Sequence, residues 1–158
     1  MNILVLCTGN SARSILLESI INHSNIPGLR AYSAGSRPSG SVHPQSLRLL
    51  SKLGHNTRDA RSKSWDEFAE PDAPEMDIVI TVCGSAAGET CPIWPGAPVR
   101  THWGVEDPAA AAERDWERAF QEAYDILAKR AAALLSLPLD RLDVNELKET
   151  LDRIGKLT

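Results

Sequence analysis

The sequence predicts an α/β fold with a mainly parallel sheet, and three observations support this. Apolar runs at 3–6 and 77–83 lack the alternation of a half-exposed strand, so each suits a strand buried on both faces. The first run leads through a loop into an apolar helical segment at 15–21. Strands that alternate with helices are typical of parallel sheets, which bind ligands beyond the C-terminal ends of their strands. Cys7 and Cys83 each follow such an end.

The other elements can be assigned in chain order. Residues 31–34 are a candidate for a short second strand, and the leucines between 47 and 53 mark a helix. From 116 to 134, large apolar side chains recur every three or four residues, which defines one helix face. That face indicates core packing and not an aromatic binding site. The segment 143–146 resembles a capping box, so we expect a short last helix.

Size and composition limit the possible functions. A chain of 158 residues with 42% apolar content can form one core, so we expect a single domain over 1–158 with a C-terminal helical extension at about 137–158. The net charge of −4 argues against nucleic-acid binding. The apolar N-terminus is too short to span a membrane and lacks the flanks of a signal peptide. The simplest expected location is the cytoplasm.

The segment from 7 to 14 has the composition of an oxyanion cradle. A loop between a strand and a helix can turn its backbone N–H groups inward, where the helix N-terminus adds partial positive charge. Arg13 would supply two parallel donors to a tetrahedral oxyanion. The same groups should lower the pKa of the Cys7 thiol, so that it attacks as an anion. The predicted substrate-binding residues are Thr8, Gly9, Asn10, Ser11, Ala12, Arg13 and Ser14.

A plainer interpretation of Cys7 is a small buried residue at the end of a strand, which is common for cysteine. Taken alone, that interpretation would be preferred. The arginine six positions later, the glycine within the loop and the serine that could donate to the thiolate favour the functional one.

Three motifs together resemble a known family. They are the segment 7–14, the segment 32–35 (Tyr-Ser-Ala-Gly) and the segment 102–108, from His-Trp-Gly to Asp-Pro. In order and separation they are similar to the low-molecular-weight tyrosine phosphatase superfamily, specifically its arsenate reductase branch. The resemblance runs to about residue 136. It implies a three-layer α/β/α fold with a four-stranded parallel sheet, Cys7 as nucleophile and Arg13 as oxyanion clamp.

The resemblance also gives Asp107 a role. In similar proteins the aspartate of the Asp-Pro pair is a general acid that protonates the oxygen leaving as the cysteine attacks. On its own, Asp107 would be interpreted as an ordinary aspartate at a helix start, which Pro108 fixes in place. Glu106 is a weaker candidate for the acid.

Cys83 and Cys91 enclose a segment of small residues, and they separate a reductase from a phosphatase. A phosphatase has no chemical use for two more thiols, whereas a reductase can store an oxidising equivalent as a disulfide. The expected relay runs from Cys7 to Cys83 to Cys91. The resemblance suggests thioredoxin as the reductant, with glutaredoxin and glutathione as the alternative. A zinc site at the two cysteines and His102 is disfavoured because the spacing is wrong and a fourth ligand is not apparent.

The chain departs from the family pattern at several positions. The anion loop has Ala12 where many relatives have a second cysteine, and Ala109 follows Asp-Pro where phosphatases carry aromatic residues. Some reductases of the family bind potassium with asparagine, glutamate, serine and aspartate. Asn10, Glu18 and Ser33 match the first three of these ligands, but Lys63 takes the aspartate position. We therefore expect its ammonium to replace the cation, and we expect no metal or cofactor.

The sequence thus predicts an arsenate reductase for arsenic detoxification, with phosphate or sulfate as competing oxyanions. The alternative is a low-molecular-weight tyrosine phosphatase or a phosphatase of small phosphate esters, since the same loop binds phosphate and arsenate. A third possibility is a catalytically silent oxyanion-binding or arsenic-sensing module. Neither a nucleic acid nor a membrane is expected as a partner.

Overall fold

The computed structural model describes residues 1–84, 94 and 97–158. Cys91 therefore lies outside the described residues. The strands and helices are, in chain order, β1 (Asn2–Leu6), α1 (Arg13–His23), β2 (Arg30–Ala34), α2 (Pro44–Lys52), the 3-10 helix η1 (Trp65–Phe68), β3 (Ile78–Thr81), β4 (Val99–His102), the 3-10 helices η2 (Pro108–Ala110) and η3 (Glu113–Asp115), α4 (Trp116–Leu135) and α5 (Val144–Ile154).

The four strands form one parallel sheet in the order β2-β1-β3-β4. The α/β class and the four-stranded parallel sheet are therefore confirmed. Ile3 to Leu6 are almost fully buried, as expected of a central strand with neighbours on both sides. The third strand is shorter than the apolar run predicts, because only Ile78–Thr81 pair with β1. β4 is a strand that the sequence analysis did not find.

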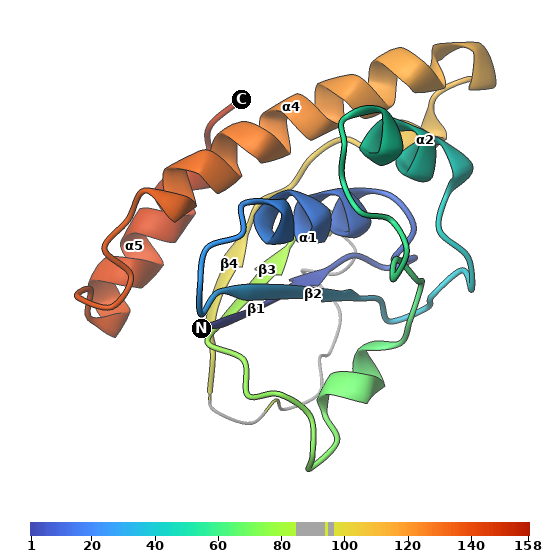
Figure 1. The fold of residues 1–158 in the computed structure, drawn as a ribbon. Coiled ribbons are helices and arrows are strands. Elements are labelled where there is room, and N and C mark those ends of the chain that lie inside the picture. Colours follow the sequence, from blue (N-terminus) through green and yellow to red (C-terminus); the bar gives the residue numbers. More distant parts are fainter. Residues whose placement is uncertain (85–93, 95–96) are drawn as a thin grey trace.

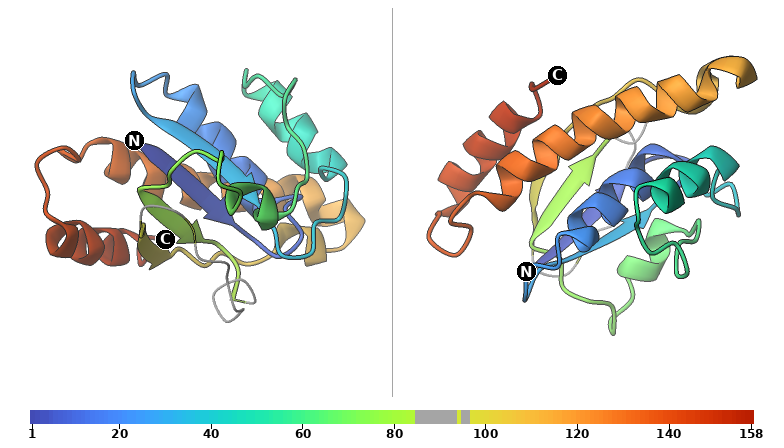
Figure 2. Two further views of the ribbon diagram at one scale, coloured as in Figure 1. Left: turned by 90° about the horizontal axis from the view of Figure 1, so that it is seen from below. Right: turned by 45° about the horizontal axis from the view of Figure 1, so that its top comes forward.

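Helices α1, α2 and α4 lie together on one face of the sheet, while η1 lies on the other (Figure 1). Figure 2 shows the same arrangement from two further directions, with α4 running across α1 and α2. The face of α4 that the periodicity predicts is the buried one: Phe120, Leu127, Ala131 and Leu134 are among its buried residues. The sheet and these helices thus form one continuous core.

Each edge strand of the sheet has a contact on its outer side: a side chain at β2, and the last helix at β4. At β2, the Asn22 side chain accepts a hydrogen bond from Ala31 N at 2.8 Å and donates one to Ala31 O at 2.9 Å. At β4, Thr101 donates to Asp152 of α5 at 2.7 Å. Gly155, just after α5, packs so closely that a Cβ there would lie 2.7 Å from the His102 carbonyl oxygen.

The last helix begins as the sequence predicts. Asp143 accepts from Glu146 N at 2.8 Å, and the Glu146 side chain accepts from Asp143 N, so both bonds of the capping box are present. None of the described helices combines the length and the apolar character that crossing a membrane requires.

Candidate active site

The anion loop, residues 7–13, joins β1 to α1 at the C-terminal edge of the sheet. Its backbone carbonyls are held from outside by neighbouring segments. The bonds are Arg37 N to Thr8 O (3.0 Å), Ser39 N and Ser62 Oγ to Gly9 O (3.0 and 3.1 Å), and His43 N and Ser46 Oγ to Ser11 O (3.0 and 2.9 Å). These bonds fix the path of the anion loop between β1 and α1.

Gly35 allows the loop to lie against the end of β2. A Cβ at this position would fall 2.3 Å from Thr8 O and 2.6 Å from Cys7 O, which no side chain can tolerate. Gly35 also donates to Lys63 O at 2.9 Å and accepts from Trp65 N at 2.9 Å. The last position of the Tyr-Ser-Ala-Gly motif therefore requires glycine, because the backbone of Gly35 lies directly against the backbone of Cys7 and Thr8.

Asn10 supports the loop from beneath. Its φ of 45° lies in the left-handed region, which asparagine tolerates better than most residues. The buried side chain donates to Ser14 Oγ at 2.8 Å and to Ser33 Oγ at 3.0 Å, and it accepts from Lys63 N at 2.9 Å. Ser14 thus belongs to a buried polar network below the loop, where its hydroxyl accepts from Asn10.

Lys63 lies in the position where the sequence comparison placed a cation. Its Nζ is 3.7 Å from a carboxylate oxygen of Glu18, and it donates to Ser33 Oγ at 3.4 Å and Arg61 O at 3.1 Å. Burial lowers the pKa of this lysine, while the charge of Glu18 acts in the opposite direction. The ammonium group therefore lies beside the oxygens of Glu18 and Ser33, whereas the Asn10 oxygen accepts from the Lys63 backbone N–H.

The thiols of Cys7 and Cys83 meet in the site. Both line the same cavity, and Thr8 N donates to Cys83 Sγ at 3.3 Å. The expectation of a lowered pKa for Cys7 is wrong for this state. The Cys83 hydrogen bond raises it most, burial raises it further, and the charge of Arg13 lowers it only in part. In this structure the Cys7 thiol therefore lies in one cavity with a second thiol, that of Cys83.

Arg13 connects the anion loop to the segment 103–107, here named the acid loop. Nη1 donates to Val105 O at 2.9 Å, and Nη2 lies 3.6 Å from an Asp107 carboxylate oxygen. The side chain is only 14% exposed. Its buried Nε has no hydrogen-bond partner among the described residues. A buried donor without a partner is costly, so this N–H is available for an incoming oxyanion.

Asp107 is held at the mouth of the site. Its Oδ1 accepts from Ala109 N at 3.0 Å, so it caps the short helix η2. Asp107 was expected at a helix start; the helix that it caps is the short η2, and η3 follows before α4 begins at Trp116. The side chain is 43% exposed, so the carboxyl group can exchange protons with solvent.

These groups surround one cavity of about 280 Å³. Its described lining is Cys7, Thr8, Gly9, Asn10, Ser11, Ala12, Arg13, Cys83, Asp107 and Ala109. Every predicted site residue that the structure describes lines it except Ser14, which lies below the loop. No aromatic side chain appears among these lining residues. The described residues also contain no cluster of three or more metal-ligating side chains.

The model of the low molecular weight phosphotyrosine protein phosphatase family matches residues 2–152. The chain belongs to this family. Among curated relatives, an arsenate reductase of Halalkalibacterium halodurans is 35% identical over 127 residues, which is 79% of this chain and 88% of that protein. An arsenate reductase of Bacillus subtilis is 33% identical with the same coverage.

Solved structures of the family include similar chains. A thioredoxin-dependent arsenate reductase of Corynebacterium glutamicum superposes with a TM-score of 0.62 at 26% identity. The match covers 85% of this chain and 59% of that one. An arsenate reductase of Archaeoglobus fulgidus gives a TM-score of 0.61 at 27% identity, covering 82% and 98%.

One feature of this family member was not found by sequence reasoning. The Val105 carbonyl fixes Arg13, but a backbone group carries no residue signature. The nearness of Cys7 and Cys83 did follow from the sequence, because adjacent parallel strands end at the same edge of the sheet.

Proposed function

We propose that this protein is a thioredoxin-coupled arsenate reductase that uses Cys7, Cys83 and Cys91 in turn. One observation carries the proposal: the thiols of Cys7 and Cys83 line one oxyanion-sized cavity that also contains Arg13. A phosphatase needs the first thiol alone. The arsenate reductases among its relatives support the same reaction for this chain.

The first step joins arsenate to Cys7. The loop N–H groups and Arg13 hold the oxyanion, and Cys7 Sγ attacks arsenic while one hydroxyl leaves as water. The Cys7 thiol and dihydrogen arsenate have together the atoms and charge of the thiol-arsenate adduct plus water. Asp107, at the cavity mouth and beside Arg13, acts as the general acid for the leaving oxygen.

The second step is the reduction. Cys83 Sγ attacks Cys7 Sγ, the sulfur–arsenic bond breaks, and its two electrons go to arsenic, which takes up the Cys83 thiol proton and leaves as arsenite. The two thiols share one cavity, and the step requires their Cα atoms to lie within roughly 4.4–6.8 Å, the range for a disulfide. Cys91 then attacks Cys83, which returns Cys7 to its thiol and leaves a Cys83–Cys91 disulfide.

The outer disulfide needs an external dithiol, which we propose is thioredoxin. Its two electrons restore Cys83 and Cys91, and glutaredoxin with glutathione is the alternative donor. The resting enzyme must keep three thiols reduced, which fits the cytoplasm. The cavity, with Ala109 and without an aromatic wall among its described residues, fits a small tetrahedral oxyanion better than an aryl phosphate.

The decisive experiment separates the three cysteines by single turnover. Reduced protein is mixed with arsenate without any reductant, and arsenite and disulfides are measured. Wild type and Cys91→Ser should each release one arsenite per chain, the variant stopping at a Cys7–Cys83 disulfide. Cys7→Ser and Cys83→Ser should release none. With thioredoxin, its reductase and NADPH, only wild type should turn over.

The other outcomes are equally informative. If Cys91→Ser turns over continuously with glutaredoxin and glutathione, the reductase remains and the three-thiol relay is wrong. If arsenite never forms while para-nitrophenyl phosphate is hydrolysed by wild type and Cys83→Ser alike, the phosphatase function replaces it. Arsenate binding without arsenite or hydrolysis would indicate a sensing module.

A further inference from the structure

Arg130 on α4 is a buried cation outside the cavity. It is only 3% exposed, and burial lowers its pKa. The described residues provide it with no ion pair. Burying a charge without a counterion costs free energy unless its N–H groups form hydrogen bonds. The hydrogen-bond partners of Arg130 therefore indicate which segments it holds.

The donors of Arg130 reach two separate segments. Nη1 donates to Trp103 O at 2.8 Å and to Gly104 O at 3.2 Å, which are the first carbonyls of the acid loop. Nε donates to Leu157 O at 2.9 Å, in the segment that follows α5. One guanidinium therefore ties the start of the acid loop to the C-terminus.

The far end of the acid loop is held by the other arginine. Arg13 binds Val105 O at 2.9 Å and lies beside Asp107 at 3.6 Å. The C-terminal segment adds a further hold on the start of the loop, because Trp103 Nε1 donates to Leu151 O of α5 at 2.9 Å. The loop that carries Asp107 is thus held by two guanidinium groups, in addition to the backbone bonds from Trp103 N to Thr81 O at 2.7 Å and from Val105 N to Val82 O at 3.2 Å.

We infer that Arg130 is a positioning residue for Asp107, and that α5 and the C-terminal segment complete its hold on the acid loop. Arg130 touches neither the cavity nor the anion loop. It sets where the acid loop leaves β4, and so where Asp107 stands relative to the oxygen that leaves. This inference rests on the general-acid role in the proposed function.

The test is a double-mutant cycle on the first turnover. Arsenite release without reductant is measured for wild type, Asp107→Asn, Arg130→Met and the double variant. Asp107→Asn should slow the rate about a hundredfold, as expected for loss of a general acid. Arg130→Met should slow arsenite release about tenfold. The arsenate concentration that gives the half-maximal rate should change less than twofold. The double variant should be no slower than Asp107→Asn alone.

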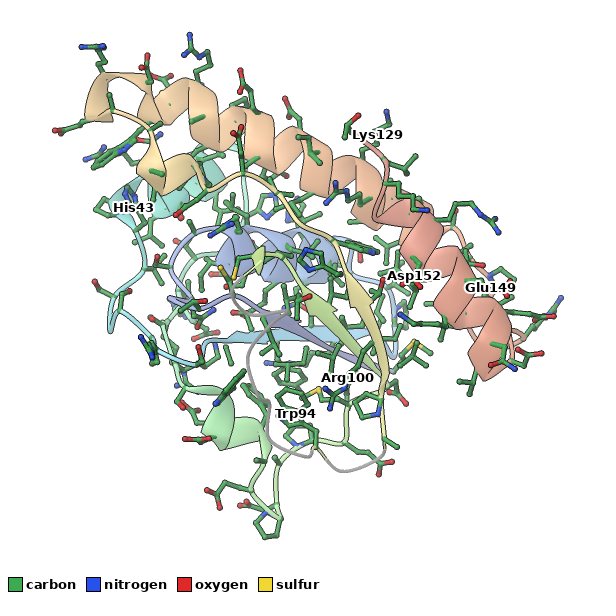
Figure 3. The ribbon with its side chains drawn as sticks, turned by 180° about the vertical axis from the view of Figure 1, so that it is seen from behind. His43, Trp94, Arg100, Lys129, Glu149 and Asp152 are labelled. Atoms are coloured by element: carbon green, nitrogen blue, oxygen red, sulfur yellow. The ribbon has the colours of Figure 1, made fainter. Side chains whose placement is uncertain are left out.

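A matched control lies next along the helix. Lys129 donates to Thr158 O at 3.1 Å, so it also contacts the C-terminus but not the acid loop (Figure 3). Lys129→Met should keep the wild-type rate. If Arg130→Met is unstable, Arg130→Lys takes its place, because it keeps the charge but lacks the forked donors of arginine. Arg130→Lys should fold, and its rate of arsenite release should fall about threefold.

Each failure has a separate meaning. Rate losses that multiply in the double variant would make Arg130 merely structural and overturn the inference. An unchanged rate in both Arg130 variants, with Asp107→Asn slow, would overturn the inference and leave the proposed function standing. An unchanged rate in Asp107→Asn would remove the general acid itself, and the inference with it.

Discussion

The anion loop and the acid loop meet across one cavity but are held in different ways. The anion loop is fixed by backbone N–H groups and hydroxyls of segments that surround it at the edge of the sheet. The acid loop is held by two backbone bonds, Trp103 N to Thr81 O and Val105 N to Val82 O, and in addition by the side chains of Arg13 and Arg130, which come from different helices. The position of the anion loop is thus set by many contacts around a sequence motif. The position of the acid loop also depends on Arg130, a side chain outside the cavity.

The largest expected effect follows from Gly35→Ala. A Cβ there would meet backbone oxygens of Thr8 and Cys7, and backbone cannot move aside without distorting the anion loop. We expect a loss of about 2–3 kcal/mol in unfolding free energy, at the upper end of overpacking effects. Phosphate affinity should fall at least about tenfold, an equilibrium change worth about 1.4 kcal/mol. Urea denaturation and titration calorimetry measure the two quantities.

Gly84→Ala is the matched control, because a Cβ at Gly84 would have no heavy atom of the described residues within 4 Å. It should unfold and bind phosphate like wild type. Tight phosphate binding by Gly35→Ala would show that the anion loop is more compliant than its contacts indicate.

The second prediction concerns the thiol pair. Cys83 is the largest cause of the raised pKa of Cys7, so Cys83→Ala should lower that pKa. A shift of about one unit gives about tenfold more thiolate at a fixed pH below the pKa. Iodoacetamide modification of Cys7 at pH 7, followed by mass spectrometry, should accelerate by that factor. Cys83→Ser, which keeps a hydrogen-bonding group, should fall between; equal rates in all three proteins would remove Cys83 as the cause.

The third prediction tests what lies beneath the anion loop. With the Lys63 ammonium among the oxygens of Glu18 and Ser33, wild-type turnover should change less than about twofold when sodium replaces potassium at constant ionic strength. Lys63→Asp removes the ammonium and adds a carboxylate. Its melting temperature should be higher in potassium than in sodium, since a ligand that binds only the folded state stabilises it. Strong potassium dependence in wild type would contradict the replacement.

The smallest expected effect comes from His43, which contacts the anion loop and is sensitive to the charge of Asp107. Its N–H donates to Ser11 O, its ring packs against Trp116 at 4.5 Å, and its Nδ1 accepts from Gln45 N at 3.0 Å to cap α2 (Figure 3). Only an unprotonated Nδ1 can accept. Burial lowers the pKa of His43, while the charge of Asp107 raises it in part.

The sign follows from proton binding. Below the ordinary pKa of 6.5 the unfolded chain takes up this proton more readily than the folded one, so stability falls as pH falls through that window. His43→Asn keeps a capping acceptor that does not titrate. Its unfolding free energy should fall less than that of wild type between pH 7 and 5. Because His55 has a lowered pKa as well, only the difference between the two proteins is informative.

Sequence reasoning succeeded where a pattern is local. The strand at Ile3–Leu6, the buried face of α4 and the capping box of α5 each depend on spacing within a few residues. The place of Lys63 also followed from the motifs, because the anion loop and β2 fix the positions around it.

Sequence reasoning failed where a strand lacks an apolar run and where a pKa depends on a residue distant in the sequence. β4 was missed because its four residues include exposed Arg100 and His102, which give no apolar run. The direction of the Cys7 pKa was wrong because the argument counted the loop N–H groups and Arg13 but not the Cys83 thiol. The roles of the site residues, and the relay through Cys91, stay predictions.

The Asn22 amide at Ala31 has a consequence for self-association. An outer strand of a sheet offers donors and acceptors to any passing polypeptide, which is how many proteins begin to form fibres. The side chain of Asn22 presents one donor and one acceptor, as a peptide group of a neighbouring strand would. The Asn22 amide therefore occupies the hydrogen-bonding groups of Ala31 on the edge strand β2, and a strand of another copy of the chain cannot pair at that residue.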